Sequence, residues 1–386
     1  MQVAVVAPIM VRHDAISLAA RDTVRVLAAD ARFEARHFGA ACDYDDIAHR
    51  RCHDVSDLLL DPAYLDADAA IFHFGIHHSL FDALWAAGPP VRIVRFHNVT
   101  PAEFVDEDSV PVIERSLRQI DTLRRADEIW ADSTVNAEAL VARGFDPARV
   151  RVIPLVVEDP RSCRFTDKSP DTVEILFVGR FARSKGLHDL IPAIARMGLP
   201  RGAVRVTLAG NTAWSNPAYL ALLRDLIDRH DLNATVRFAG TVADAERERL
   251  FHAAHIMVMP SYHEGFCRPV IEGMRAGCVP VVYDAYNLPH IAAGFGRVVP
   301  AGDVAGLAAV LTELAGAIPG AIARPAEARL PVDRGLLSAD DFALLTRRYA
   351  DGFSLDAIGS EIKQRLIVLA GDRRHPLAAG CLAPLA

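Results

Sequence analysis

Short apolar runs alternate with amphipathic stretches through the second half of this sequence. The apolar runs, which predict strands, are 173–179, 204–209, 235–239, 254–259 and 279–283. The stretches between them, which predict helices, are 185–196, 217–230, 243–253 and 267–277. Near-continuous apolar strands are typical of a sheet that is buried on both faces. This alternation therefore predicts a doubly wound parallel sheet with right-handed crossovers.

The first half of the chain shows the same pattern. Strands are predicted at 2–7, 33–38, 69–74, 91–96, 128–131 and 150–155, and helices at 10–30, 110–125 and 133–143. Asp132 and Ser133 are predicted to cap the last of these helices. The charged, proline-containing segment 158–171 reads as a linker between domains. After Gly302-Asp303 a helix is predicted that ends at Leu314, and later helices are predicted at 338–350 and 355–370. A chain of 386 residues is long for one core and suits two domains of this α/β class.

The stretch from Pro260 to Gly277, PSYHEGFCRPVIEGMRAG, predicts a strand that turns through a loop into a helix. Pro260 ends the preceding apolar run, and Gly265 lets the backbone turn tightly. Pro269 fits the first turn of a helix, where its missing N–H is tolerated. Free N–H groups and the positive end of the helix dipole then point to one place outside the sheet. The stretch therefore predicts an anion site.

Two carboxylates flank this predicted anion site. Glu264 lies in the loop and Glu272 in the helix, about 10 Å apart at the helical rise of ~1.5 Å per residue. A nucleotide diphosphate sugar carries sugar hydroxyls, a diphosphate and a ribose diol in the same order and on the same scale. Glu264 can therefore hold the sugar and Glu272 the ribose. The alternative is that Glu264 caps the loop and Glu272 is a solvated helix residue, and spacing alone does not decide between the two.

The wider pattern around these carboxylates, P-S-x-x-E-G-F-x-x-P-x-x-E-G-M, resembles the donor-binding signature of glycosyltransferase family 4, or group 1. Members of that family are retaining enzymes with the GT-B fold. Residues 175–186, ILFVGRFARSKG, are similar to its G-R-x-x-x-x-K-G loop. Residues 206–210 and 236–240 are similar to its next two strands. The resemblance is ordered over about residues 126–316 and is looser elsewhere.

The resemblance implies two Rossmann-like domains that face a central cleft, with the final helices crossing back to the first domain. Residues 1–160 would be the acceptor domain and 161–350 the nucleotide-sugar donor domain. Residues 351–386 would hold the returning helix and a tail. The implied enzyme is a metal-independent hexosyltransferase. It would move a sugar from UDP-hexose or GDP-hexose to a hydroxyl acceptor, with retention of configuration, in bacterial polysaccharide or glycoconjugate synthesis.

The resemblance also implies roles for single residues. Arg180 and Lys185 would stabilise charge that develops on the departing diphosphate. His97, at the tip of the strand 91–96, matches a histidine that the family places beside the donor sugar. The catalytic residues implied in this way are His97, Arg180, Lys185 and Glu264. The donor-binding residues implied are Gly179, Arg180, Lys185, Gly210, Asn211, Glu264, Gly265, Phe266, Cys267, Arg268 and Glu272.

The first domain departs from the family in the loop after its first strand. The family usually has a Gly-Gly pair there, whereas this chain has PIMVRHD at 8–14. Arg12 and His13 can replace backbone contacts with side-chain contacts, or can be solvated. His77 and His78 follow the strand 69–74, at the strand end where α/β sheets bind ligands. These four residues are acceptor candidates, and the alternative for His77 and His78 is that they are ordinary loop histidines.

Two D-x-D sequences raise the question of a metal. Asp43 with Asp45 and Asp66 with Asp68 match a motif that holds a divalent metal in a different glycosyltransferase fold. Neither lies on the predicted strand–loop–helix unit, and such pairs arise easily among 49 acidic residues. The histidines near residue 77 have no evident closing Cys or Asp ligand. The sequence therefore predicts no metal site, and no cofactor besides the nucleotide-sugar co-substrate.

Bulk properties narrow the class of partner and the location. The net charge of −7 argues against nucleic acid as the main partner, because phosphate-tracking surfaces are normally basic. No unbroken apolar run approaches ~18 residues, so no membrane span is predicted. The six cysteines form no C-x-x-C pair and are expected to be free thiols in a reducing cytoplasm. The acceptor class (saccharide, lipid-linked saccharide or small molecule) and peripheral contact with the inner face of a membrane stay open.

Two other functions remain alternatives to sugar transfer. One is a non-catalytic nucleotide-sugar-binding protein, and the other is a GT-B epimerase or hydrolase. A dinucleotide oxidoreductase is disfavoured, because no G-x-G-x-x-G follows a predicted strand. Product analysis with and without an acceptor separates the alternatives, since it reports transfer, water-only products or no turnover.

Overall fold

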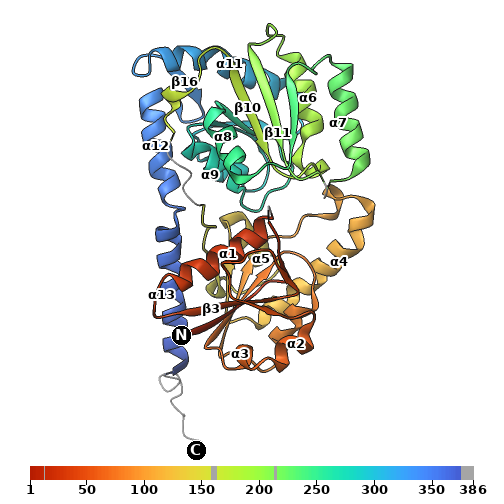
Figure 1. The fold of residues 1–386 in the computed structure, drawn as a ribbon, viewed down its shortest axis with the longest axis vertical. Coiled ribbons are helices and arrows are strands. Elements are labelled where there is room, and N and C mark those ends of the chain that lie inside the picture. The colour runs from red at the N-terminus through yellow and green to blue at the C-terminus, as the bar shows by residue number, and fades with distance from the viewer. Residues whose placement is uncertain (13, 158–162, 213–214, 375–386) are drawn as a thin grey trace, which may run out of the picture. The chain divides into compact units, whose positions relative to one another are not determined.

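The computed structural model describes residues 1–12, 14–157, 163–212 and 215–374, which form two compact units (Figure 1). Unit 1 comprises Met1–Val99, Pro111–Val156 and the chain from Leu355 onward. Unit 2 comprises Thr100–Val110 and Val157–Ser354. The segment Thr100–Val110 thus packs with the unit opposite to the one that the domain prediction gave it.

A seven-stranded parallel sheet forms the centre of unit 1, in the order β5-β3-β1-β6-β7-β8-β9. Its strands are β1 Gln2–Val6, β3 Glu34–Gly39, β5 His49–Arg51, β6 Ala69–Phe74, β7 Val91–Phe96, β8 Glu128–Ala131 and β9 Val150–Val152. The short strands β2 Ile9–Met10 and β4 Ala41–Cys42 pair beside it. The strand order reverses between β1 and β6. The loops that follow these two strands therefore meet at the switch point where open α/β sheets bind ligands.

The helices of unit 1 cover this sheet. They are α1 Ala15–Ala28, α2 Val55–Leu60, α3 Pro62–Leu65, α4 Val110–Gln119, α5 Thr134–Ala142 and α13 Leu355–Arg374, with 3-10 turns η1 Ser79–Trp85, η4 Ile120–Arg125 and η5 Pro147–Arg149. Val5 and Ile71 of the sheet are fully buried in one core with Val24 of α1 and Ile362 of α13. Because α13 follows α12 of unit 2 in the chain, the predicted return of the final helix to the first domain is confirmed.

Unit 2 has a six-stranded parallel sheet in the order β12-β11-β10-β13-β14-β15, with its switch point between β10 and β13. Its strands are β10 Val173–Val178, β11 Val204–Ala209, β12 Val236–Gly240, β13 Ile256–Met259, β14 Val279–Asp284 and β15 Arg297–Pro300, with a hairpin of β16 Arg329–Val332 and β17 Gly335–Ser338. Its helices are α6 Leu187–Arg196, α7 Pro217–Arg229, α8 Asp244–Ala253, α9 Arg268–Arg275, α10 Leu288–Ala292, α11 Val304–Ala323 and α12 Ala339–Asp351. Shorter 3-10 turns are η2 Ala102–Phe104, η3 Glu107–Ser109, η6 Phe165–Asp167 and η7 Arg183–Lys185. The predicted pair of doubly wound, Rossmann-like domains is thus confirmed.

Local sequence explains where several helices begin. The Asp14 side chain accepts from Ser17 N at 2.8 Å and caps α1. Asn216 caps α7 ahead of Pro217 at its first position, and the Ser338 side chain caps α12. Ser133 caps α5 by accepting from Asn136 N at 3.2 Å, as predicted. Asp132, which was predicted to share this cap, is instead bonded within the sheet, as described below.

Some predicted elements end elsewhere. The helix predicted at 110–125 stops at Gln119 and continues as the 3-10 turn η4. The helix predicted to end at 314 runs to Ala323, because Leu314, Ile318 and Ala321 are buried and their packing outweighs Gly316 and Pro319. The strand β15 and the hairpin β16–β17 were not predicted.

The longer α11 also corrects the sequence-based search for membrane spans. That search counted only unbroken apolar runs, whereas α11 has a mean hydropathy of 1.6 despite its polar residues. It is the one helix among the described residues that is long and apolar enough to cross a membrane by length and composition. It packs on α6, β10, β15 and β16 of unit 2. Since core helices of this kind have the same composition, α11 is weak support for a span.

Candidate functional site

The loop between β13 and α9 is held in a defined shape by its own residues. Cys267, the residue before α9, has a left-handed backbone with φ of 74°, which is uncommon for a residue with a side chain. Asn287 Nδ2 donates to the Phe266 carbonyl at 2.9 Å. Burial raises the pKa of the Cys267 thiol well above its usual value, so this sulfur stays protonated. The loop therefore presents backbone, rather than a reactive thiolate, at the start of α9.

Lys185 and Glu264 meet across the switch point of unit 2. Lys185 follows β10, Glu264 follows β13, and Lys185 Nζ lies 2.7 Å from Glu264 Oε1. The same oxygen accepts from Ser261 Oγ at 3.1 Å. Both charged side chains are mostly buried, at 14% and 12% exposed. The two residues that sequence reasoning assigned to the diphosphate and the sugar are thus brought into direct contact.

The other predicted cation, Arg180, lies just after β10. It is exposed, and among the described residues its guanidinium makes no hydrogen bond or ion pair. Gly179 and Gly210, which follow the neighbouring strands β10 and β11, approach each other closely. A Cβ on Gly210 would lie 1.9 Å from the Gly179 carbonyl oxygen, so only glycine fits there. Asn211 comes next, and its carbonyl accepts from Ser215 Oγ at 2.8 Å. These loops line the carboxyl edge of the sheet beside Lys185.

Glu272 is not a solvated helix residue, because it is 5% exposed within α9. It pairs with Arg247 of α8, whose guanidinium also lies over the Phe251 ring. The Glu272 carboxylate raises the pKa of the Arg247 guanidinium, and burial opposes this change less strongly. Sequence reasoning missed Arg247. The only available signal was an arginine on the predicted helix 243–253, and nothing local indicated its pairing with residue 272.

The remaining predicted donor contacts are divided between backbone and core. The Phe266 ring is buried against Phe353 at a centroid distance of 5.7 Å. Arg268 is 8% exposed at the start of α9. Gly265, like Glu264 before it, is partly exposed. Phe266 and Cys267 can therefore contact a ligand mainly through their backbone.

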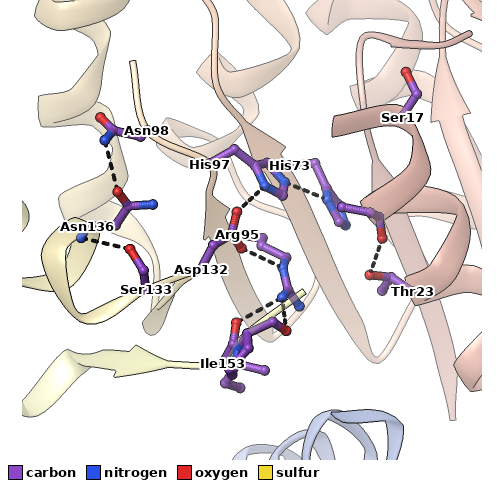
Figure 2. Close-up of polar contacts among 12 residues, drawn as sticks. Ser17, Thr23, His73, Arg95, His97, Asn98, Asp132, Ser133, Asn136 and Ile153 are labelled. Atoms are coloured by element: carbon purple, nitrogen blue, oxygen red, sulfur yellow. Dashed lines mark hydrogen bonds and ion pairs between the residues drawn. The ribbon is translucent and has the colours of Figure 1, made fainter. Parts of the chain in front are cut away.

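Unit 1 contains a second polar cluster at the carboxyl ends of its strands (Figure 2). His97 Nδ1 lies 2.6 Å from Asp132 Oδ2, and His97 Nε2 lies 3.0 Å from His73 Nδ1. Arg95 Nε donates to the other Asp132 oxygen at 3.1 Å, and its NH2 group donates to the carbonyls of Ile153 and Pro154. The His97 and Asp132 side chains are only 4% and 2% exposed. Four side chains thus form one continuous buried network.

The network holds both imidazoles in place. His97 contacts Asp132 through Nδ1 and His73 through Nε2, so both of its ring nitrogens are occupied. Burial, with the positive charges of its neighbours as smaller causes, lowers the pKa of His73 well below its usual value, so His73 stays neutral. A sugar hydroxyl at His97 would therefore have to replace His73 at Nε2. The assignment of His97 to the donor sugar stays a prediction.

The acceptor candidates all follow β1 or β6, the strands that flank the switch point of unit 1. Arg12 is exposed, with its guanidinium 5.6 Å from the Tyr44 ring centroid. His77 N donates to Ser116 Oγ, and the His78 ring accepts from Leu80 N at 3.3 Å. Burial lowers the pKa of His78. His13 lies outside the described residues. No hydrogen bond among the described residues joins Arg12 to His77 or His78.

The aspartates of the D-x-D sequences serve the local backbone. Asp43 accepts from Arg12 N at 3.2 Å, and Asp68 accepts from Gln2 N at 2.8 Å. Asp66 ends α3, and Asp45 lies in a turn. Among the described residues, no three His, Cys, Asp or Glu side chains are grouped to hold a metal. The described cysteines, 42, 52, 163, 267 and 278, are free thiols as predicted.

Comparison with known proteins agrees with this arrangement. Residues 161–315 match the family model described as Glycosyl transferases group 1. A D-inositol 3-phosphate glycosyltransferase from Kineococcus radiotolerans is 29% identical over 262 residues, which are 62% of this chain and 59% of that protein. The O-antigen chain mannosyltransferase B of Escherichia coli is 28% identical over 140 residues, which are 35% of this chain and 34% of that protein. The matched stretches thus span between a third and three fifths of these relatives.

Solved structures extend the likeness to the whole fold. The crystal structure of Anabaena HepE in complex with UDP-glucose has a TM-score of 0.70 and 18% sequence identity, and covers 95% of this chain and 100% of that one. The switch-point sheets of both units and the returning helix α13 are the features of the GT-B fold. Residues 161–315 thus match the model of the group 1 glycosyl transferases, on a chain whose fold is GT-B.

Proposed function

We propose that this protein is a retaining glycosyltransferase that moves a hexose from UDP-hexose or GDP-hexose to a hydroxyl acceptor. The observation that carries the proposal is the Lys185–Glu264 pair, 2.7 Å apart at the switch point of unit 2. A cation for the diphosphate and a carboxylate for sugar hydroxyls are what such a donor needs. Both stand at the strand ends where α/β sheets bind ligands.

Donor binding would divide the pair between two parts of the ligand. The diphosphate would take Lys185 and the exposed Arg180, next to the positive dipole end at the start of α9. The sugar hydroxyls would donate to Glu264. A carboxylate offers about four lone-pair sites, so Glu272 can accept from a ribose diol while it keeps Arg247. The backbone of loop 264–268 would lie along the sugar and phosphate.

Catalysis in this proposal rests on the leaving group. Lys185, Arg180 and the helix N-terminus stabilise the negative charge that develops on the diphosphate as the glycosidic bond breaks. These groups supply the positive charge that a metal brings in other folds, so transfer should not need one. EDTA should leave the rate unchanged. A loss of activity that Mn²⁺ or Mg²⁺ reverses would contradict metal independence.

Retention of configuration follows from the resemblance to family 4, and the geometry of unit 2 supports it. A double displacement needs a free carboxylate nucleophile near the anomeric carbon. In the proposed complex Glu264 accepts from Ser261 Oγ and from the sugar hydroxyls, so it is used at the hydroxyl edge of the sugar and not at the anomeric carbon. Front-face transfer, in which the departing diphosphate accepts the acceptor's proton, uses the groups that are present. Proton NMR of fresh product from an α-linked donor should show an α linkage, and a β linkage would overturn the mechanism.

Donor and acceptor can be identified in two steps. A thermal-shift panel of nucleotides and nucleotide sugars comes first, since a ligand at 100 times its dissociation constant adds about 2.7 kcal/mol of stability. The best donor is then incubated with saccharide, lipid-linked saccharide and small-molecule acceptors. A role in bacterial polysaccharide or glycoconjugate synthesis, in the cytoplasm at the membrane's inner face, is part of the proposal. Donor binding without any product, or water-only products, would favour the two alternatives.

A further inference from the structure

A mostly buried carboxylate, Asp189, follows Lys185 by four residues in the chain. Asp189, in the first turn of α6, accepts two tyrosine hydroxyls on the same oxygen, Oδ2. Tyr262 Oη donates to it at 2.5 Å and Tyr283 Oη at 3.0 Å. Burial is the main cause that raises the pKa of both phenols, and the bonds to Asp189 add to it. Both hydroxyls therefore keep their protons and remain donors to Asp189.

The two tyrosines connect Asp189 to different parts of unit 2. Tyr262 lies in the loop after β13, close in sequence to Glu264, whereas Tyr283 lies within β14. Tyr262 is held to the lysine loop at a second point, because its backbone N donates to the Ser184 carbonyl at 2.8 Å. Its bonds thus join the loop that carries Glu264 both to the loop that carries Lys185 and to α6, which follows that loop. The bond from Tyr283 joins the same carboxylate to strand β14 and does not involve the loop that carries Glu264.

Packing reinforces this join. The Tyr262 ring lies nearly parallel to those of Phe104 and His188, at centroid distances of 6.1 and 6.0 Å. Gly186 has a left-handed φ of 64°, and a Cβ there would lie 1.9 Å from the Pro260 carbonyl oxygen. The backbones on either side of the Lys185–Glu264 pair are therefore as close as glycine allows. A small shift of either loop would alter the distance between the two charges.

We infer that Tyr262, through its bond to Asp189, is a positioning residue for the donor site. It sets the spacing between the cation for the diphosphate and the carboxylate for the sugar before the donor binds. The inference rests on the proposed function, since it takes those two roles for Lys185 and Glu264. Tyr262 needs no contact with the donor to act in this way. A purely structural role would instead make the Tyr262 and Tyr283 hydroxyls equivalent, because each donates one part-buried bond to the same oxygen.

The test compares Tyr262→Phe with its matched control, Tyr283→Phe. Calorimetry measures the dissociation constants of the nucleotide sugar and of the free nucleoside diphosphate, and steady-state kinetics measures kcat and KM. Tyr262→Phe should weaken binding of the sugar-bearing donor and lower kcat/KM by roughly tenfold to a hundredfold, the scale of a misplaced reacting group. Free diphosphate binding should change much less. Tyr283→Phe should remain within about threefold of wild type in all of these, because it moves neither loop.

Equal losses in the two phenylalanine variants would overturn the inference. A Tyr262→Phe variant whose affinities for free nucleoside diphosphate and for nucleotide sugar fall by the same factor would also overturn it. If Tyr262→Phe does not fold, Asp189→Asn replaces it, since asparagine keeps an oxygen that can accept from Tyr262. That variant should retain much of the kcat/KM that Asp189→Ala loses, and equal values for the two would contradict the inference. A wild-type protein that binds donors but transfers no sugar would refute only the proposed transfer, because the binding ratio still tests Tyr262.

Discussion

The two switch points of this protein are built in different ways. In unit 1 the polar groups stand on the strands or directly after them, as His73 in β6, Arg95 in β7 and Asp132 after β8 show. They bond to one another and are buried. In unit 2 the strands β10 and β13 end in apolar residues. The charged Lys185 and Glu264 lie in the loops that follow these strands.

This difference separates two ways to place a charge. Side chains on paired strands are fixed by register, as His73 is fixed opposite Arg95, so their bonds come with the fold of the sheet. Loop residues have no such register and must be joined by other contacts, such as those of Tyr262 and Gly186. We therefore expect damage in unit 1 to appear mainly as lost stability. Damage in unit 2 should appear mainly as lost turnover.

The largest effect should come from Asp132→Ala in unit 1. This change leaves the buried Arg95 guanidinium without its carboxylate and removes the partner of His97 Nδ1. Removing one member of a buried ion pair typically costs about 3–5 kcal/mol of unfolding free energy. Urea denaturation followed by circular dichroism measures the loss. Asp132→Asn, which keeps an acceptor oxygen, should lose distinctly less, and a fully stable Asp132→Ala protein would show that the network is not structural.

This network also shows where prediction from sequence stops. The strand ends were predicted, and so were the two loops that carry Lys185 and Glu264. Each has a local pattern in which an apolar run is followed by a glycine and the start of a helix. The bonds of His97 to Asp132 and of Glu272 to Arg247 join residues far apart in sequence, and no local pattern specifies them. Asp132 was instead predicted to cap α5, which is what an Asp-Ser pair before a helix normally indicates.

The packing of residues 100–110 was missed for a similar reason. This segment follows β7 of unit 1, so its position in the chain assigned it to the first domain. Its Phe104 ring instead packs on the Tyr262 and His263 rings of unit 2. A single aromatic residue in a predicted loop gives no sign of which surface will bury it. Fold class and switch-point loops were thus accessible from sequence, whereas the partners that fix each charge were not.

The second largest effect tests unit 2. Lys185→Ala and Glu264→Gln should each lower the transfer rate by roughly 10²–10³, the usual cost of losing one group that stabilises transition-state charge. The melting temperature should fall less than in Asp132→Ala, because both side chains keep some exposure to solvent and Glu264 keeps its bond from Ser261. Arg183→Ala is the matched control, since Arg183 lies on the same loop with its guanidinium over Tyr219. Activity of the Lys185 variant within threefold of this control would refute the donor assignment.

A smaller effect should separate the two ends of the donor. Glu272→Gln should weaken the binding of free nucleoside diphosphate as well as that of the nucleotide sugar. The expected loss is about tenfold, because one charge-assisted hydrogen bond is lost. Glu264→Gln should weaken only the sugar-bearing ligand. Glutamine is used because it keeps the size of the side chain and an acceptor oxygen for Arg247. Calorimetry that gives the same loss for both ligands in both variants would contradict the assigned order along the donor.

The smallest effect compares one buried histidine from each unit. Burial lowers the pKa of His37 in unit 1 and of His263 in unit 2 to about 4. In the unfolded chain a histidine has a pKa near 6.5, so on acidification the unfolded state binds the proton first. The stabilising contribution of each neutral imidazole is therefore complete above pH 6.5 and declines as pH falls toward 4. When the pH falls from 6.5 to 5, each of these two histidines should lower the unfolding free energy by about 1.5 kcal/mol. The loss of stability on acidification, measured by urea denaturation, should be smaller by that amount in His37→Gln and in His263→Gln than in the wild type.

The two variants should differ at pH 8. His37 bonds the Ala7 carbonyl, whereas no partner of His263 Nε2 exists among the described residues, so only His37→Gln should lose stability there. Unchanged acid sensitivity in both variants would show that neither imidazole is neutral and buried in solution.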